Sequence, residues 1–102
     1  MKKILLLVIL LTQQVFAAET YVHGNITSIT SITEGLLIRL EEGNLPTVCN
    51  GTPYGWMLIP QTSKVILGVT LAQWYQKKRS VVVYVEPYSG NGFCRVTQVQ
   101  PG

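Results

Sequence analysis

Residues 62–86 read TSKVILGVTLAQWYQKKRSVVVYVE and decide the fold, because a helix and a strand follow one another in this stretch. Either Thr62 or Ser63 can cap a helix that runs to about Gln76. The segment Ser80–Glu86 is a run of valine and tyrosine, which is typical of a strand. The stretch therefore predicts one helix leading directly into one strand.

The predicted helix is apolar over a broad part of its surface. Apolar residues recur along it at the spacing of three and four that brings side chains to one face. A surface this broad suits a helix that plugs a barrel or lies under a sheet. Two stripes make it up, Leu67–Leu71–Trp74 and Val65–Ile66–Val69.

The segment before this helix predicts three strands. Residues 21–33 are rich in β-branched side chains, but their apolar spacing slips to three at Ile26, Ile29 and Ile32. One face of a flat strand cannot hold that spacing, so we expect a bulge near Thr27 and Ser28. Two further strands are expected at 36–41 and 55–59, separated by a loop rich in glycine, proline and asparagine.

A final strand is expected at 93–99, after a turn at 87–92. The predicted order is strand, strand, strand, helix, strand, strand. We find no linker and no internal domain repeat. The sequence thus predicts a single, mainly β domain with five strands and one helix.

Residues 1–17 have the pattern of a cleavable signal peptide. A pair of lysines precedes the apolar run 4–11, and small residues follow near Ala17. The run spans roughly 12 Å, whereas a bilayer core needs about 30 Å. Cleavage would leave residues 18–102 as one domain, without a stable membrane anchor. We expect a periplasmic or secreted protein.

Two cysteines in an exported chain favour a disulfide. A Cys49–Cys94 bond would close a loop of about 45 residues and stabilise the fold by roughly 4 kcal/mol. With His23 as the only histidine, the chain lacks a fourth ligand for a tetrahedral zinc site. We therefore expect no metal and no cofactor.

The formal charge of +3 includes the two lysines of the predicted signal peptide, so the remaining chain carries about one positive charge. That balance gives no reason to expect a nucleic-acid partner. A local cluster, Lys77-Lys78-Arg79, follows the predicted helix. These cations either favour the helix dipole or contact an anionic surface.

Catalysis has little support in the sequence. The chain contains no aspartate, and its only histidine is His23. Adjacent side chains such as Glu41 and Glu42 point apart on a strand, so they do not form an acid and base pair. A disulfide would also remove the thiols as nucleophiles. We expect a protein that is not an enzyme.

The helix between the third and fourth strands, and a cysteine on the last strand, resemble the OB-fold, a five-stranded Greek-key barrel. Among exported proteins the architecture resembles B subunits of bacterial A–B toxins of the subtilase-cytotoxin type. That resemblance implies glycan binding and a homo-oligomer, but no motif carries over individual binding residues. Residues 51–56, Gly-Thr-Pro-Tyr-Gly-Trp, also resemble a family of short secreted proteobacterial proteins. Periplasmic OB-fold proteins of the stress response are an equally close comparison.

An OB-like barrel would place its ligand on strands two and three and on the loop between strands four and five. Aromatic side chains in that region could stack on sugars. Trp56 and Trp74, which have apolar neighbours, are expected in the core. The candidate binding surface is Arg39, Tyr54, Tyr88, Ser89 and Asn91.

Two functions remain open on the sequence. The first is an exported, non-enzymatic binding module for a glycan or a protein. The second is a structural or stress-related envelope protein with no small-molecule ligand.

Overall fold

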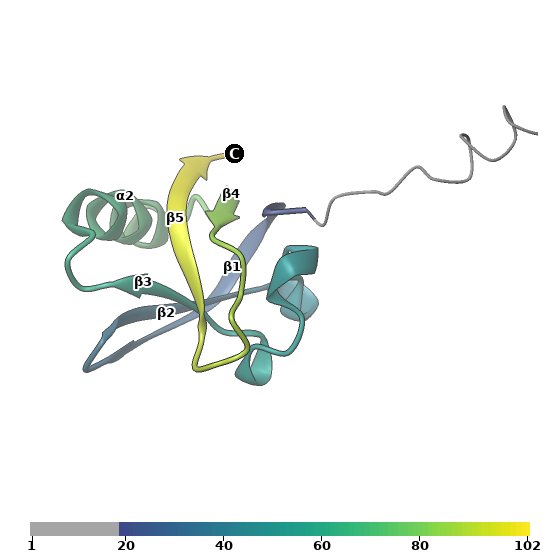
Figure 1. Cartoon of the computed structure of the whole chain (residues 1–102). Helices are drawn as coiled ribbons and strands as arrows, with labels where there is room; N and C mark the ends of the chain where they lie inside the picture. The colour runs from purple at the N-terminus through teal and green to yellow at the C-terminus, as the bar shows by residue number, and fades with distance from the viewer. Residues whose placement is uncertain (1–18) are drawn as a thin grey trace, which may run out of the picture.

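The structure, a computed structural model, describes residues 19–102 (Figure 1). The predicted signal peptide, residues 1–17, lies outside the described residues. Five strands and one α-helix follow the predicted order, which is confirmed. They are β1 (Tyr21–Ile32), β2 (Gly35–Leu40), β3 (Met57–Pro60), α2 (Lys64–Tyr75), β4 (Ser80–Val85) and β5 (Cys94–Pro101). Three short 3-10 helices, Glu41–Gly43, Thr47–Cys49 and Pro53–Gly55, lie in the connection between the second and third strands.

The five strands form one closed ring in the order β1-β2-β3-β5-β4. The ring closes because β4 pairs with β1 in antiparallel fashion, with Tyr21 opposite Tyr84. The β3–β5 pair is parallel and short, joining Met57 to Cys94 and Leu58 to Arg95, so the sheet is mixed. The other pairings are antiparallel.

β1 pairs with two neighbouring strands, and a bulge separates its two halves. Its first half, Tyr21–Asn25, pairs with β4, while the second half pairs with β2. The register shifts between Ile26 and Ser28, which confirms the bulge inferred from the slipped apolar spacing. A two-residue turn, Thr33-Glu34, then leads into β2.

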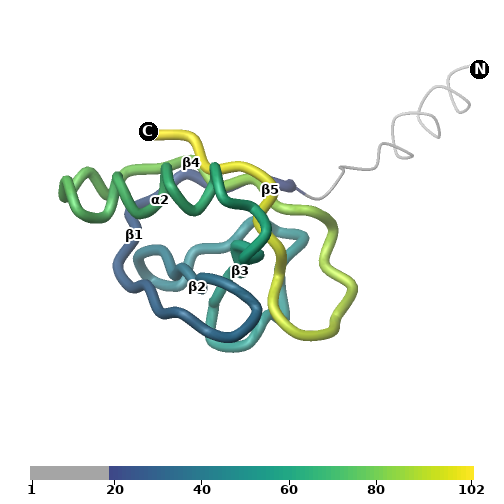
Figure 2. The backbone as a smooth tube through the Cα atoms, turned by 90° about the vertical axis from the view of Figure 1, so that its left-hand side faces the viewer, coloured from purple at the N-terminus to yellow at the C-terminus, as the bar shows by residue number. Residues whose placement is uncertain are grey.

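The core fills the inside of the ring, where alternate strand residues point inward. α2 lies over this core and packs against β5 (Figures 1 and 2). Several core side chains are fully shielded from solvent: Ile38, Leu40, Met57, Ile59, Val81 and Val83.

The helix begins after Ser63 and ends next to Gln76, as predicted, but it differs from expectation in two details. Ser63 precedes the helix, but its side chain makes no capping hydrogen bond. The apolar stripe through Val65 does not lie wholly against the sheet, since Val65 is 81% exposed. The helix carries apolar side chains on both sides. Those on its inner side pack against the core, while those on its outer side remain exposed to solvent.

The disulfide Cys49–Cys94 is confirmed. Its Cα atoms lie 5.6 Å apart, a distance ordinary for disulfides, and both cysteines are fully buried. A disulfide is compatible with export to an oxidising compartment. Within residues 19–102, we find no helix with the length and apolar character needed to cross a membrane.

Candidate functional site

An open hollow of about 650 Å³ lies where the long β2–β3 connection folds back on the strands. Its volume is within the range of small-molecule sites. We call it the Arg39 hollow, after the side chain around which it is built. Its lining residues are Ser28, Arg39, Glu42, Gly43, Leu45, Tyr54, Gly55 and Trp56.

Arg39 is held in place by the backbone around it. It lies on β2 opposite Ser28 of the β1 bulge, and its Nε–H donates a 2.9 Å hydrogen bond to the Tyr54 carbonyl. The bond ties the second strand to the loop that precedes β3. Because one donor is fixed in this way, the guanidinium keeps a defined orientation in the hollow.

Two glycines form a cradle for this guanidinium. A Cβ atom on Gly43 would lie 3.2 Å from Nη2 of Arg39, and one on Gly55 would lie 3.4 Å from its Nε. Both glycines have positive φ angles, 66° and 76°. Glycine is thus needed here for backbone conformation and, at Gly43, for the space beside the arginine.

The residue before each of these glycines also has a left-handed backbone conformation, which is uncommon for residues other than glycine. Glu42 has φ 56° and Tyr54 has φ 55°, and both line the hollow. Such strained positions cluster at functional sites, where surrounding structure must hold them. The hollow is therefore bounded by two turns of the same kind, Glu42-Gly43 and Tyr54-Gly55.

The aromatic side chains of the hollow come from the segment just before β3. Tyr54 is 85% exposed, and Trp56 is half-buried. Strand alternation explains the second placement, because the inward positions of β3 are Met57 and Ile59, which are fully buried. The expectation that Trp56 belongs to the core is wrong. Trp74 is likewise half-buried, but it packs against the core.

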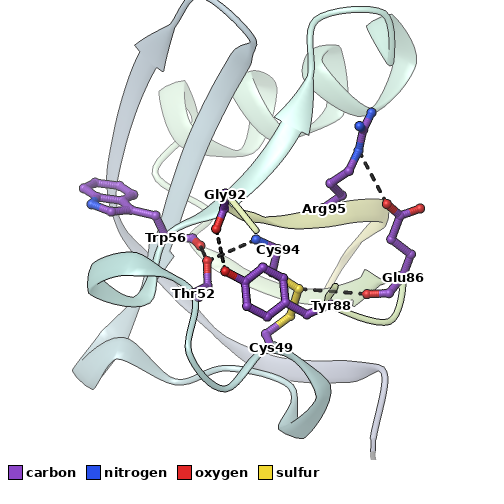
Figure 3. Close-up of a disulfide and its surroundings, with 8 residues drawn as sticks. All are labelled: Cys49, Thr52, Trp56, Glu86, Tyr88, Gly92, Cys94 and Arg95. Atoms are coloured by element: carbon purple, nitrogen blue, oxygen red, sulfur yellow. Dashed lines mark hydrogen bonds and ion pairs between the residues drawn. A yellow bond between two sulfur atoms is a disulfide. The ribbon is translucent and has the colours of Figure 1, made fainter. Parts of the chain in front are cut away.

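The loop that carries these aromatics is anchored to β5 by two adjacent links. One is the disulfide. The other is Thr52, whose buried hydroxyl donates to the Trp56 carbonyl at 2.8 Å and accepts from the Cys94 amide at 3.0 Å. Figure 3 shows Thr52 between these two partners, with the indole of Trp56 directed away from the disulfide. The anchoring fixes the position of one wall of the hollow.

The charged groups of the hollow are one cation and one anion. Arg39 and Glu42 both line it. The neighbouring Glu41 turns away and accepts hydrogen bonds from the backbone and side chain of Asn25. Within residues 19–102 the one ion pair, Arg95–Glu86 at 3.5 Å, lies elsewhere. The hollow thus presents both signs of charge with no ion pair of its own.

The other three candidate residues do not line this hollow. Tyr88, Ser89 and Asn91 line a separate depression of about 80 Å³ in the β4–β5 connection. The Tyr88 hydroxyl donates a 2.6 Å hydrogen bond to the Gly92 carbonyl, and its ring packs against the core. In this position Tyr88 stabilises its own loop. The structure therefore joins Arg39 to Tyr54 and separates them from the β4–β5 residues.

His23 lies on β1, and its Nε2 is 3.0 Å from the Ser80 hydroxyl. This pair lines neither the Arg39 hollow nor the depression in the β4–β5 connection. No carboxylate is found hydrogen-bonded to this histidine among the described residues, so the arrangement lacks the group that orients a catalytic base. Over the same part of the chain, no three metal-ligating side chains converge.

No protein-family model, no curated protein and no solved structure matches this chain.

Sequence reasoning found two residues of the Arg39 hollow and missed the others. The signal for Trp56 was present in the alternation of β3. The signal for Glu42 was the parallel between Glu42-Gly43 and Tyr54-Gly55, since paired residue-glycine steps often mark tight turns. Ser28 could have been reached from the bulge, which redirects side chains.

Proposed function

We propose that this chain is an exported, non-enzymatic binding module of OB-like Greek-key architecture, and that the Arg39 hollow binds a glycan. The observation that carries the proposal is the combination of Tyr54 and Trp56 with a guanidinium held by two glycine turns. Localisation in the periplasm or outside the cell is part of the same proposal, supported by the buried disulfide.

The chemistry of the hollow suits a sugar. A pyranose presents apolar C–H faces and a rim of hydroxyl groups. Aromatic rings such as those of Tyr54 and Trp56 can stack on the faces, while Arg39, Glu42 and Ser28 can bond to the hydroxyls. Because the guanidinium is already oriented, little conformational entropy is lost when it binds.

The position of the hollow supports the OB-like assignment. In OB-folds, ligands meet the face of strands two and three. Arg39 lies on β2, and Trp56 directly precedes β3. The ring order and the helix between β3 and β4 fit the same architecture. The loops differ, since the β2–β3 connection builds the hollow here.

Other ligands and roles fit less well. A carboxylate at Glu42 in the same hollow repels phosphate, so a nucleic acid is disfavoured. The separation of His23 from the hollows supports a protein without catalysis. A structural envelope role would not require an exposed Tyr54 in a strained conformation. A protein loop as ligand is the alternative that the binding experiment distinguishes.

Retention on a glycan array tests the proposal. We expect the oxidised protein to bind a subset of immobilised glycans, and Tyr54→Asn to weaken binding by about tenfold, in line with the strength of aromatic stacking. Asparagine tolerates the left-handed backbone at this position, so the loop is preserved. The matched control is Tyr75→Asn, which removes an equally exposed tyrosine, 78% exposed, on α2.

An array on which the wild-type protein retains no glycan contradicts the proposal, as does equal weakening by both tyrosine substitutions. If the protein captures a peptide or protein through Tyr54 and no glycan, the hollow is a protein-binding site.

The glycine cradle gives a second prediction. Gly43→Ala and Gly92→Ala introduce the same backbone strain, since the φ angles are 66° and 65°. Each should lower the free energy of unfolding by about 1 kcal/mol. A methyl group on Gly43 also displaces Nη2 of Arg39, whereas a Cβ on Gly92 meets no atom within 4 Å.

We therefore expect Gly43→Ala alone to weaken glycan binding several-fold. Urea unfolding and array titration measure the two effects. Equal glycan affinity in the two variants would show that the arginine cradle has no part in binding.

A further inference from the structure

We propose that the outward side of α2 docks on an anionic phospholipid bilayer surface. We call this surface the α2 outer face: Lys64, Val65, Gly68, Ala72 and Tyr75, with Lys77 and Lys78 just beyond the helix. It lies on the other side of the strand ring from the β2–β3 loop that builds the Arg39 hollow (Figures 1 and 2). The inference is independent of the proposed glycan binding.

The helical residues of this face are neighbours in space. At about 100° per residue, the five residues from Lys64 to Tyr75 named above fall within roughly 100° of the helix circumference. Val65 and Tyr75 are 81% and 78% exposed. A Cβ on Gly68 would meet nothing within 4 Å. The face therefore carries one exposed apolar side chain near each end of the helix, with the small residues Gly68 and Ala72 between them, and the rest of the described chain leaves it uncovered.

The charged residues of the α2 outer face itself have a single sign. The chain has no acidic residue between Glu42 and Glu86, so the helix itself carries no carboxylate. The nearest acidic residue described beside it is Glu34 of the β1–β2 turn, whose carbonyl accepts a hydrogen bond from Gln61 ahead of the helix. Lys64, Lys77 and Lys78 are all exposed. Arg79 differs, because its guanidinium stacks on the Trp74 ring at 3.6 Å. The α2 outer face thus has three exposed cations and no anion.

Helix stability does not account for two of these lysines. Lys64 lies in the first turn, where a cation opposes the helix dipole, and no acidic residue accompanies it there. Lys77 adopts φ 60° at the helix end, a position that glycine normally fills. The hydrogen bonds of that end are the usual ones, Lys78 N–H to Gln73 O and Lys77 N–H to Trp74 O. The charge of Lys64 therefore opposes the helix dipole, whereas the charge of Lys77 suits the helix end and only its backbone conformation is unfavourable.

An anionic bilayer matches this combination of groups. Lysines near a membrane surface are attracted to anionic headgroups. Tyrosine prefers the interface between headgroups and acyl chains, and a valine side chain can enter the apolar edge. The face would therefore lie flat on the surface and would not span it.

A second copy of the chain fits less well. A helix of 12 residues is about 18 Å long and about 10 Å wide, so one face covers far less than the roughly 800 Å² per partner of a stable dimer. Antiparallel pairing about a two-fold axis would also bring Lys64 of each copy close to Lys77 of the other. Like charges would then meet at both ends.

Vesicle flotation tests the proposal on the protein recovered from an export-competent host, with its processed mass verified. The probes are vesicles of phosphatidylcholine alone and vesicles with roughly one-third phosphatidylglycerol. We expect binding to the second kind only, and we expect it to disappear at about 1 M salt, where the Debye length falls to about 3 Å.

Single substitutions then assign the binding to the α2 outer face. Lys64→Gln should reduce vesicle affinity by about fivefold, and the matched Arg39→Gln, on the other side of the molecule, should leave it unchanged. Tyr75→Asn should also weaken vesicle binding, whereas Tyr54→Asn should not. The same tyrosine pair has the opposite effect on glycan retention, so the two proposals can fail separately.

Lys77→Gly separates docking from folding. Glycine relieves the left-handed strain, so this variant should unfold at higher urea while binding vesicles about fivefold less tightly. The proposal is overturned if the protein does not float with anionic vesicles at low salt. It is also overturned if binding is indifferent to Lys64 and Tyr75, or if Tyr75→Asn instead dissociates a dimer.

Discussion

Replacing both Cys49 and Cys94 by alanine should lower the free energy of unfolding by about 4 kcal/mol, the largest effect expected of any change considered for this chain. The bond joins residues 45 apart, and its loss frees a long loop in the unfolded state. A domain of this size has a total stability of about 5–15 kcal/mol, so a large share of it depends on one bond. The loop that bears Tyr54 loses one of its two anchors in the same step.

Urea denaturation of the double variant, compared with wild-type protein in the presence and absence of a reductant, measures the effect. Reduced wild-type protein should behave like the variant, which controls for the loss of the sulfur atoms. The oxidised protein should have no thiol that can be alkylated before reduction. A midpoint that reduction leaves unchanged would mean that the crosslink does not hold the fold.

Thr52→Val should be the second most destabilising change, at about 2–4 kcal/mol. The valine has the same shape but no hydroxyl, so the Cys94 amide and the Trp56 carbonyl each lose a partner. Leaving a buried backbone group without a hydrogen bond costs about 1–3 kcal/mol. Because the two groups belong to β5 and to the wall of the hollow, glycan binding should weaken as well.

Thr70→Val is the matched control. Thr70 is fully buried, as Thr52 nearly is, but its hydroxyl donates only to the Ile66 carbonyl of its own helix at 2.8 Å. That carbonyl already accepts a backbone bond in the helix, so no group is left without a partner. We expect a change below about 1 kcal/mol. Comparable losses of stability in the two variants would refute the bridging role of Thr52.

Local patterns in the sequence were sufficient to predict the framework of the fold. The strand order followed from β-branched runs, and the slip at Ile26 and Ile29 located the bulge within one residue or so. The disulfide followed from the cysteine count and the predicted compartment. The strands and the bulge depend on residues that are close in sequence. The disulfide could be predicted because two cysteines allow only one pairing.

The Arg39 hollow depends on contacts that the sequence does not display. The left-handed backbone conformation of Glu42 and Tyr54 could not be predicted from the sequence, because glutamate and tyrosine usually avoid it. A core position was predicted for Trp56 because its neighbours in the sequence are apolar. The alternation of inward and outward side chains along β3 would have been the better guide. Tyr88 could not be placed either, since its half-buried position depends on a hydrogen bond to Gly92 across its own loop.

The two tryptophans offer the most direct test of glycan binding in the Arg39 hollow, because Trp56 lines it, whereas Trp74 belongs to α2 and packs against the core. The measurement is a ¹H–¹⁵N spectrum of the two indole N–H groups during titration with a glycan retained on the array. We expect the Trp56 signal to move in a saturable way while the Trp74 signal stays in place. A saturating glycan that leaves the Trp56 signal unmoved would contradict the account.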